Sequence, residues 1–336
     1  MILAVIRLWA IMLFAAMTVS CGLGASDKIT KVSQIAMGTL VEVSAVGPPS
    51  QTKPAIEEAF NELKRVEALT SFHKDSGLTQ INNWAGKADA KADQELIDLI
   101  DVSIKFAQLS EGAFDPTIGP IARLWNFSGN DGPRLPGSQE IEATLPLVGW
   151  KLIQTDTQNQ TVSLPEQGMA LDLGAIAKGY ALDRAAEKMK SMGVKSALIN
   201  AGGDIVAFGV KAPGKPWRIG IQDPRNPNGM IAVAEINDRA VVTSGDYERF
   251  FIQDDKRYHH ILDPKTGQPA YGLQSVTIVA PDGVTADALS TAVFVLGKEK
   301  GLALVESFPE VYSLVIDSQG SIAMSKGAEN IFDLKH

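Results

Sequence analysis

The sequence is poor in the residues that build disulfide frameworks and soft metal centres. Its 336 residues include one cysteine and four histidines. A single cysteine excludes an internal disulfide framework, and the lack of a Cys and His cluster disfavours a zinc site. The net charge is −8 and there is no long basic run, so nucleic acid is not expected as a partner.

Three common catalytic and nucleotide-binding signatures are also missing. The chain contains no G-x-S-x-G, no Walker-type P-loop and no G-x-G-x-x-G. Serine-hydrolase elbows and the usual nucleotide-binding folds are therefore disfavoured. Apolar residues are not scarce, since 45% of the chain is hydrophobic. That content is ample for a core, and the length suits one large domain or two ordinary ones.

The first twenty residues are typical of an export signal. Arg7 precedes an unbroken apolar run from Leu8 to Val19, whose length suits the core of a signal peptide better than a membrane span. Cys21 follows shortly afterwards and resembles the lipid attachment site of a bacterial lipoprotein, although Thr18 stands where such sites usually carry leucine. We therefore expect a lipoprotein-type signal peptide at residues 1–20, a tether at 21–28 and a folded domain at 29–336.

Two alternatives stay open for this segment. One is ordinary cleavage to a soluble exported protein, and the other is an uncleaved anchor that begins at Met1. By the same resemblance to lipoprotein signals, Gly22 after the cysteine would not retain the protein at the inner membrane. We expect the folded part to work outside the cytoplasm, on the periplasmic side of a bacterial membrane.

Apolar residues recur at helical spacing in several stretches, and β-type segments fill much of the rest. The spacing predicts helices at 55–69, 96–110 and 285–296 and a loop at 48–54. Proline, asparagine and glycine at 223–229 predict a turn between β-type segments. Helices and strands mix without regular β–α–β alternation, so we predict an α+β fold of mainly antiparallel sheets packed with helices.

The stretch from Met169 to Gly203 predicts a short strand, a glycine turn, a helix and a second strand. The helix start, just after Asp172-Leu-Gly-Ala175, would offer unpaired N–H groups and the positive end of the helix dipole to an anion such as phosphate. Glycines in the lead-in would let a ligand approach the backbone. The alternative is a β–α connection that binds nothing.

Asp287 and Thr291 are four residues apart in the predicted C-terminal helix, so both oxygens project from one face. A carboxylate and a hydroxyl suit Mg²⁺, which commonly shares its ligand shell with phosphates. The alternative is helix capping by Thr285 with an exposed Asp287. The neighbouring histidines His259 and His260 are read as zinc ligands, as a general base, or as structural residues at a strand end.

Seven short motifs occur in order along the chain: Met37-Gly38-Thr39, Ser71-Phe72 with Asp75-Ser76, Gly112-Ala113-Phe114-Asp115-Pro116-Thr117, Asp172-Leu-Gly-Ala175-Ile-Ala-Lys178-Gly179, Asn200-Ala-Gly202-Gly203-Asp204, His260-Ile261-Leu262-Asp263-Pro264 and Ala286-Asp287-Ala-Leu-Ser290-Thr291-Ala292. In order and spacing they resemble the ApbE family of FAD:protein FMN transferases, which are exported and often lipid-anchored. The resemblance covers nearly all of Ile29 to Asp333. It implies an ApbE-like, T-fold-like architecture.

The resemblance also implies a site for FAD and a divalent metal. Eight residues would contact FAD: Met37, Phe72, Ala113, Phe114, Asp115, Asp172, Lys178 and Ile261. The backbone oxygen of Ala175 and the side chains of Asp287, Ser290 and Thr291 would hold Mg²⁺, with Ca²⁺ or Mn²⁺ as alternatives. Phe72 stands where relatives often have tyrosine, a change that keeps ring stacking. Lys178 falls where some relatives have glutamate.

The implied reaction moves FMN from FAD onto a threonine hydroxyl of a target protein and releases AMP. His260 is the candidate general base, and Asp287 and Asp172 are alternatives. The expected partners are FAD and threonine-containing acceptors such as subunits of membrane redox pumps. Two other functions stay open: a metal-dependent FAD pyrophosphatase, and a flavin-binding lipoprotein without catalysis.

Overall fold

The computed structural model describes residues 28–127, 129 and 132–335, so the predicted signal peptide and Cys21 lie outside the described residues. Within that part, the central element is an eight-stranded sheet in which neighbouring strands are antiparallel. In spatial order its strands are β1 (Ile29–Ala36), β2 (Thr39–Val46), β6 (Ser196–Ala201), β7 (Asp204–Phe208), β10 (Arg239–Gly245), β13 (Leu273–Ala280), β14 (Tyr312–Asp317) and β15 (Ile322–Met324).

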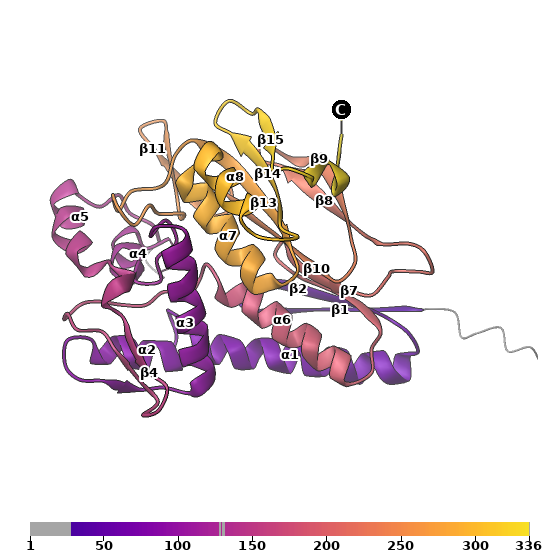
Figure 1. Ribbon diagram of the computed structural model, residues 1–336, viewed down its shortest axis with the longest axis horizontal. Helices are drawn as coiled ribbons and strands as arrows, with labels where there is room; N and C mark the ends of the chain where they lie inside the picture. Colours follow the sequence, from indigo (N-terminus) through magenta and orange to yellow (C-terminus); the bar gives the residue numbers. More distant parts are fainter. Residues whose placement is uncertain (1–27, 128, 130–131, 336) are drawn as a thin grey trace, which may run out of the picture.

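Helices cover one face of this sheet (Figure 1). The helices of the described part of the chain are α1 (Pro49–Thr70), α2 (Gly77–Trp84), α3 (Gln94–Leu109), α4 (Gly119–Trp125), α5 (Ser138–Thr144), α6 (Ala177–Ser191), α7 (Gly283–Leu296) and α8 (Lys298–Glu306), of which α4 and α5 belong to a separate small cluster. The apolar stripes of α1, α6 and α7 bury against the sheet in one continuous core. No helix among the described residues is long and apolar enough to cross a membrane.

A second, smaller sheet covers part of the other face. Its strands are β8 (Trp217–Asp223), β9 (Asn226–Ile236) and β16 (Phe332–Leu334). Successive side chains of a strand point to opposite faces of the sheet, so one strand can contribute to the cores on both sides. In β10, Ala240 and Val242 join the helical core, whereas Val241 between them joins the core under the second sheet. The fold is therefore three layers deep where the two sheets overlap.

The remaining elements are short. They are the strands β3 (Ala90–Lys91), β4 (Gln154–Asp156) and β5 (Thr161–Ser163), the hairpin β11 (Phe250–Gln253) with β12 (Lys256–His259), and the 3₁₀ turns η1 (Leu145–Leu147), η2 (Trp150–Leu152) and η3 (Ala328–Asn330). The hairpin packs on α4 through stacked rings of Phe251 and Tyr258 against Trp125. Trp125 Nε1 donates to the Gly267 carbonyl at 2.8 Å, which fixes the indole.

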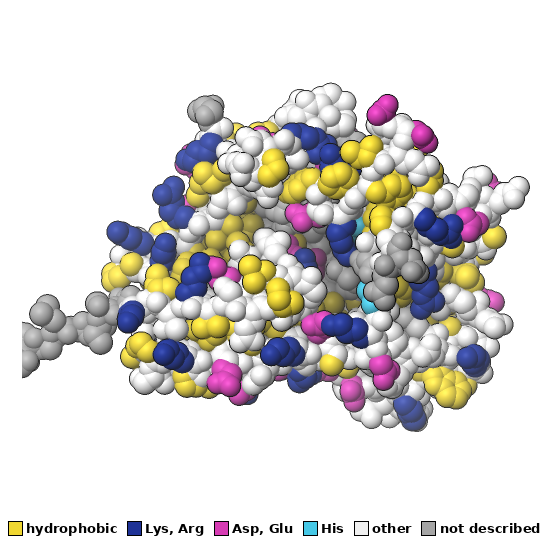
Figure 2. Space-filling model, turned by 180° about the vertical axis from the view of Figure 1, so that it is seen from behind, with side chains coloured by type: hydrophobic (Ala, Val, Ile, Leu, Met, Phe, Trp, Pro, Cys, Tyr) yellow, Lys and Arg dark blue, Asp and Glu magenta, His cyan; other side chains and the backbone are white. Residues whose placement is uncertain are grey.

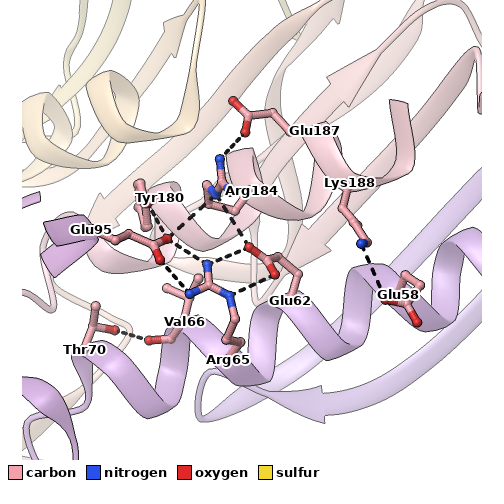
Figure 3. Close-up of polar contacts among 10 residues, drawn as sticks. All are labelled: Glu58, Glu62, Arg65, Val66, Thr70, Glu95, Tyr180, Arg184, Glu187 and Lys188. Atoms are coloured by element: carbon pink, nitrogen blue, oxygen red, sulfur yellow. Dashed lines mark hydrogen bonds and ion pairs between the residues drawn. The ribbon is translucent and has the colours of Figure 1, made fainter. Parts of the chain in front are cut away.

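A polar cluster joins α6 to α1 and α3 (Figure 3). Arg65 of α1 donates to both carboxylate oxygens of Glu95 on α3, at 2.6 and 2.7 Å, and also binds Glu62 one turn away. Tyr180 of α6 donates to Glu95 at 2.6 Å. Arg184 lies 3.5 Å from Glu62. The bidentate contacts of Arg65 join α1 to α3, and Tyr180 and Arg184 attach α6 to the same two carboxylates.

The predicted α+β fold with antiparallel sheets is confirmed, but three local predictions are wrong. Residues 48–54 are not a loop, because α1 begins at Pro49, a position at which the missing N–H costs nothing. The turn predicted at 223–229 is shorter, since β9 already begins at Asn226.

The third error is the strand predicted at Met169. This segment is buried but forms no strand. The amide of Asn82 takes the place of a partner strand: its Nδ2 donates to Leu171 O at 2.9 Å, and its Oδ1 accepts from Leu171 N at 2.7 Å. A side chain 89 residues away therefore satisfies the backbone groups that a sheet would otherwise pair.

Candidate functional site

The start of α6 lies at the centre of the candidate site. Two contacts shape the chain before it: Asp172 N donates to Pro116 O at 2.7 Å, and Gly174 N donates to the Asp172 carboxylate at 2.8 Å. The N-cap residue Ile176 provides no side-chain hydrogen bond to the helix. Instead Leu173 O, in the preceding turn, accepts Ile176 N at 3.0 Å and Ala177 N at 2.8 Å, so the next N–H groups of the helix depend on partners from elsewhere in the fold.

One such group is the carboxylate of Asp287 on α7. Gly179 N, in the first turn of α6, donates to Asp287 Oδ2 at 2.9 Å. The regions around Ala175 and Asp287 therefore lie side by side. Asp287 is only 6% exposed, and burial, followed by the charge of Asp204, raises its pKa to about 7. The alternative of an exposed Asp287 is wrong.

Hydroxyl groups gather on the same part of α7. Ser290 Oγ lies 2.8 Å from Ser244 Oγ of β10, and Thr291 Oγ1 lies 3.5 Å from the same atom. Ser290 also donates to the backbone oxygen of Asp287 at 2.8 Å. The two α7 hydroxyls predicted to help hold a metal therefore lie together, joined by a serine that the sequence did not single out.

Lys178 forms an ion pair with Asp204. Its Nζ lies 2.6 Å from Asp204 Oδ2, at the start of β7. The preceding turn places this carboxylate, because Gly203 N donates to Asn200 Oδ1 at 2.8 Å and Gly202 adopts a positive φ of 64°. Burial alone would lower the pKa of Lys178, but the charges of Asp204 and Asp287 outweigh it and raise that pKa. The ammonium group stays charged.

Phe72 and Asp172 flank an arginine. The guanidinium of Arg123 on α4 lies 5.0 Å from the centre of the Phe72 ring, a cation–π arrangement. Burial lowers the pKa of Arg123, and the charge of Asp172 partly offsets it. A Cβ at Gly119 would approach the Phe72 ring to 3.0 Å, so this glycine allows α4 to pack closely on the ring. Two residues predicted to bind FAD therefore share one neighbour.

The base of the β11–β12 hairpin brings further charged groups to the site. His260 N donates to Arg249 O at 3.0 Å and closes the hairpin. Burial lowers the pKa of Arg249, offset first by Asp172 and then by Glu248. Burial raises the pKa of Glu248, which Lys178 offsets. The charge of Arg249 therefore interacts with two carboxylates of the site, Asp172 and Glu248.

His260 itself is a neutral imidazole. Burial, followed by the charge of Arg249, holds its pKa well below the ordinary value of 6.5. Its Nδ1 is buried, with no hydrogen-bond partner among the described residues. The next residue, Ile261, belongs to the main core. By contrast His259 is structural, because its Nε2 lies 2.8 Å from the Ala270 carbonyl. The zinc interpretation finds no support in these contacts.

The turn predicted to contact FAD at Ala113 to Asp115 is buried. The Phe114 ring packs in the core. The carboxylate of Asp115 accepts from Thr117 N at 2.8 Å and from Trp150 N at 3.1 Å, and burial raises its pKa. This side chain therefore fixes the local turn. The turn reaches the site through the Pro116 carbonyl that holds Asp172.

Met37 lies in the turn between β1 and β2, with a positive φ of 52°. Its N–H donates to Glu67 Oε2 at 2.9 Å, and Glu67 Oε1 lies 2.5 Å from Lys74 Nζ. Lys74 belongs to the segment that carries Phe72. The sheet edge and the Phe72 segment are therefore joined through one carboxylate.

The face of the molecule turned away from the view of Figure 1 has a hollow near its middle (Figure 2). Lysine or arginine, acidic and histidine side chains lie around this hollow, and charged side chains are also spread over the rest of the face. A concave surface on which a few polar and charged groups converge is the usual form of a small-molecule binding site.

The oxygen donors near Asp287 fit a hard cation. Among the described residues no group of three His, Cys, Asp or Glu side chains could hold a metal ion. The predicted donor set differs from such a group, because it combines one carboxylate with hydroxyls and a backbone oxygen. In that part of the chain Asp287 accepts a hydrogen bond through Oδ2 alone, which leaves Oδ1 for a ligand. A bound cation would reduce the repulsion between the negative charges of Asp287 and Asp204. Oxygen donors suit Mg²⁺.

Four charged residues near the site were not predicted as site residues: Asp204, Arg123, Glu248 and Arg249. Asp204 ends the Asn200 to Asp204 motif, so the sequence held a signal for it. The other three come from segments without a motif. Only tertiary structure brings them near Lys178 and Asp172.

The comparisons with known proteins agree on one family. A family model described as the ApbE family matches residues 37–315. The chain is 38% identical over 326 residues to the FAD:protein FMN transferase of Treponema pallidum, covering 92% of this chain and 90% of that protein. The chain therefore belongs to the ApbE family.

Solved structures agree with this assignment. The ApbE protein of Thermotoga maritima superposes with a TM-score of 0.85 at 38% identity, covering 90% of this chain and 99% of that one. The flavin transferase ApbE of Vibrio cholerae has a TM-score of 0.82 at 29% identity, covering 91% and 99%.

Proposed function

We propose that this protein is an FAD:protein FMN transferase that moves FMN from FAD onto a threonine hydroxyl of an acceptor protein. The observation that carries the proposal is the contact of Gly179 N with Asp287 Oδ2 at 2.9 Å. It brings the start of α6, with the positive end of its dipole, beside a carboxylate and the hydroxyls of α7, a combination that suits a diphosphate with a divalent cation. Relatives named FAD:protein FMN transferases support the same reaction.

The reaction is phosphoryl transfer. The acceptor hydroxyl attacks the phosphorus on the FMN side of the pyrophosphate, a new P–O bond forms, and the bond to the bridging oxygen breaks. The electron pair leaves with AMP, and the hydroxyl proton passes to a base. The products are a phosphoester-linked FMN on threonine and free AMP.

The chain's own groups have separate roles. The positive end of the α6 dipole and the charges of Lys178 and Arg249 neutralise the diphosphate. Phe72, with its face already occupied on one side by Arg123, stacks on a ring of FAD. Asp172 would fix the turn against the ligand.

Asp287, Ser290, Thr291 and the backbone oxygen of Ala175 would hold Mg²⁺. When bound, the ion supplies positive charge beside the pyrophosphate. Ca²⁺ and Mn²⁺ take the same kind of donor.

His260 is the candidate base. Burial and the charge of Arg249 lower its pKa, which keeps the ring neutral but makes it a weak base; the buried Nδ1, without a partner in the described part of the chain, would be the acceptor atom. Asp287, whose pKa is raised to about 7, is the alternative.

The export and anchoring of the protein form a separate part of the proposal. We infer a signal peptide at residues 1–20, a lipid on Cys21 and a folded domain that works on the periplasmic side, with acceptors such as subunits of membrane redox pumps. Its support is the apolar run followed by the single cysteine. In a Cys21→Ser variant the protein should carry no lipid, which mass spectrometry of the N-terminal peptide detects. A wild-type N-terminal peptide without a lipid on Cys21 contradicts lipidation.

One incubation tests the function. The purified protein is mixed with FAD, Mg²⁺ and a threonine-containing acceptor, and the products are separated. Covalent flavin on the acceptor supports the transferase, free FMN indicates a pyrophosphatase, and unchanged FAD indicates a binding protein. Asp287→Ala should abolish the transfer, whereas Asp98→Ala, which removes an exposed carboxylate on α3, should not. Full activity of Asp287→Ala at limiting Mg²⁺ contradicts the metal assignment.

A further inference from the structure

The first turns of α6 and α7 are in direct contact at two glycines. A Cβ at Gly179 would lie 2.0 Å from Gly283 O, and a Cβ at Gly283 would lie 2.5 Å from Gly179 O. No side chain fits at either position without separating the helices. The close approach of the two backbones therefore depends on glycine at both positions.

Each helix also caps the other. Asp183 of α6 accepts Gly283 N through Oδ1 at 2.7 Å and Val284 N through Oδ2 at 2.9 Å. Asp287 of α7 accepts Gly179 N at 2.9 Å. Both helices read Gly-x-x-x-Asp, so each glycine and its aspartate are four apart and share one face. Two orphan N–H groups of α7 and one of α6 are satisfied across the contact.

The two aspartates are not equivalent. Asp287 has one oxygen on Gly179 and belongs to the proposed metal site. Asp183 has both oxygens on α7 and none on the site. Its two bonds fix the position of the first α7 turn, one turn before Asp287.

We propose that Asp183 is a positioning residue: its two bonds to the start of α7 hold Asp287 and Thr291 in place against the start of α6. The inference rests on the proposed function for the identity of the ligand. It predicts that Asp183 affects metal affinity without touching the metal, as partners of metal ligands commonly do.

The test variant is Asp183→Asn. The asparagine keeps the shape but offers one acceptor oxygen where two N–H groups need one each. The control is Asp282→Ala, which removes the cap of α7's own N-terminus, where Asp282 Oδ1 accepts Thr285 N at 2.7 Å. Both variants weaken the same helix start, but only the first weakens the contact with α6.

Two readouts separate positioning from general destabilisation. Binding of Mn²⁺ to the FAD-loaded protein, measured by electron paramagnetic resonance, should weaken about tenfold or more in Asp183→Asn and stay near wild type in Asp282→Ala. In turnover assays the Mg²⁺ concentration for half-maximal rate should rise in Asp183→Asn, while kcat at saturating Mg²⁺ recovers. A merely structural role would lower kcat and leave the Mg²⁺ dependence unchanged.

Wild-type Mn²⁺ affinity in Asp183→Asn overturns the inference, and so does equal weakening in Asp282→Ala. If Asp183→Asn does not fold, Asp183→Glu, which keeps the charge but moves the oxygens outward by one methylene, is expected to weaken Mn²⁺ binding in the same way. A wild-type protein that binds Mn²⁺ but transfers no FMN contradicts the proposed function alone. A wild-type protein that binds no Mn²⁺ contradicts both.

Discussion

Replacing Asp287 by asparagine should stabilise the metal-free protein while it abolishes the proposed activity. The asparagine side chain keeps an oxygen that can accept Gly179 N, so the contact between α6 and α7 survives. What disappears is a negative charge that is buried and lies near the charge of Asp204. The attraction of Asp287 to Lys178 offsets part of the cost, but burial and the charge of Asp204 prevail, so removing the charge is favourable in the metal-free protein.

The magnitude follows from the pKa of Asp287. A rise from 3.8 to about 7 corresponds to about 4 kcal/mol of differential interaction between the two protonation states. Burying the asparagine amide costs about 1–3 kcal/mol. We therefore expect a net gain of about 1–3 kcal/mol in the free energy of unfolding at a pH where the carboxyl is ionised.

The sign of the pH dependence follows from the same shift. The folded-state pKa is raised, so the favourable contribution of Asp287 is fully present below the unfolded pKa of 3.8 and is lost as the pH rises through about 7. The wild type should lose stability over that window, and the Asp287→Asn variant should lose less. The two proteins should differ most at about pH 8, where the carboxyl is ionised, and least at about pH 4.

The assay is urea unfolding in EDTA at about pH 5 and about pH 8, repeated with Mn²⁺. The metal should stabilise the wild type by mass action and leave the variant unchanged. A variant that is less stable than the wild type in EDTA at the higher pH would refute the reasoning, because it would mean that the buried carboxylate is fully compensated by its surroundings.

Two further predictions concern the start of α6. Gly179→Ala should lower the free energy of unfolding by about 1–3 kcal/mol, because its Cβ would lie 2.0 Å from a backbone oxygen. The control is Gly137→Ala, where the atom nearest to the new Cβ is 3.5 Å away. An equal Tm in both variants contradicts the close contact. Lys178→Met leaves Asp204 buried without its 2.6 Å partner and should lower the free energy of unfolding in urea by about 3–5 kcal/mol. This loss should be smaller in a Lys178→Met, Asp204→Asn double variant. An equal loss in the double variant would mean that the two residues are not coupled.

The sequence predicts much of the fold and one half of the site. Asp287 and Thr291 follow from helical spacing alone, since residues four apart share a face. The strand expected at Met169 fails for a physical reason: its backbone partner is the side chain of Asn82, which no local pattern reveals. The pairing of Lys178 with Asp204 is equally long-range. Local periodicity predicts elements, whereas the partners of buried charges depend on how distant elements pack.

Two sets of contacts hold α6: the polar cluster around Arg65 (Figure 3) and the contact between Gly179 and Gly283. They differ in how strongly salt affects them. The Arg65 side chain is 43% exposed and the Arg184 side chain 41%, so mobile ions with a Debye length of about 8 Å at physiological strength screen these ion pairs. The contact of Gly179 with Gly283 and the buried Asp287 are reached by few such ions. At high ionic strength the ion pairs of α6 should therefore weaken, whereas its contact with α7 should not. The candidate site should stay assembled when the ionic strength changes.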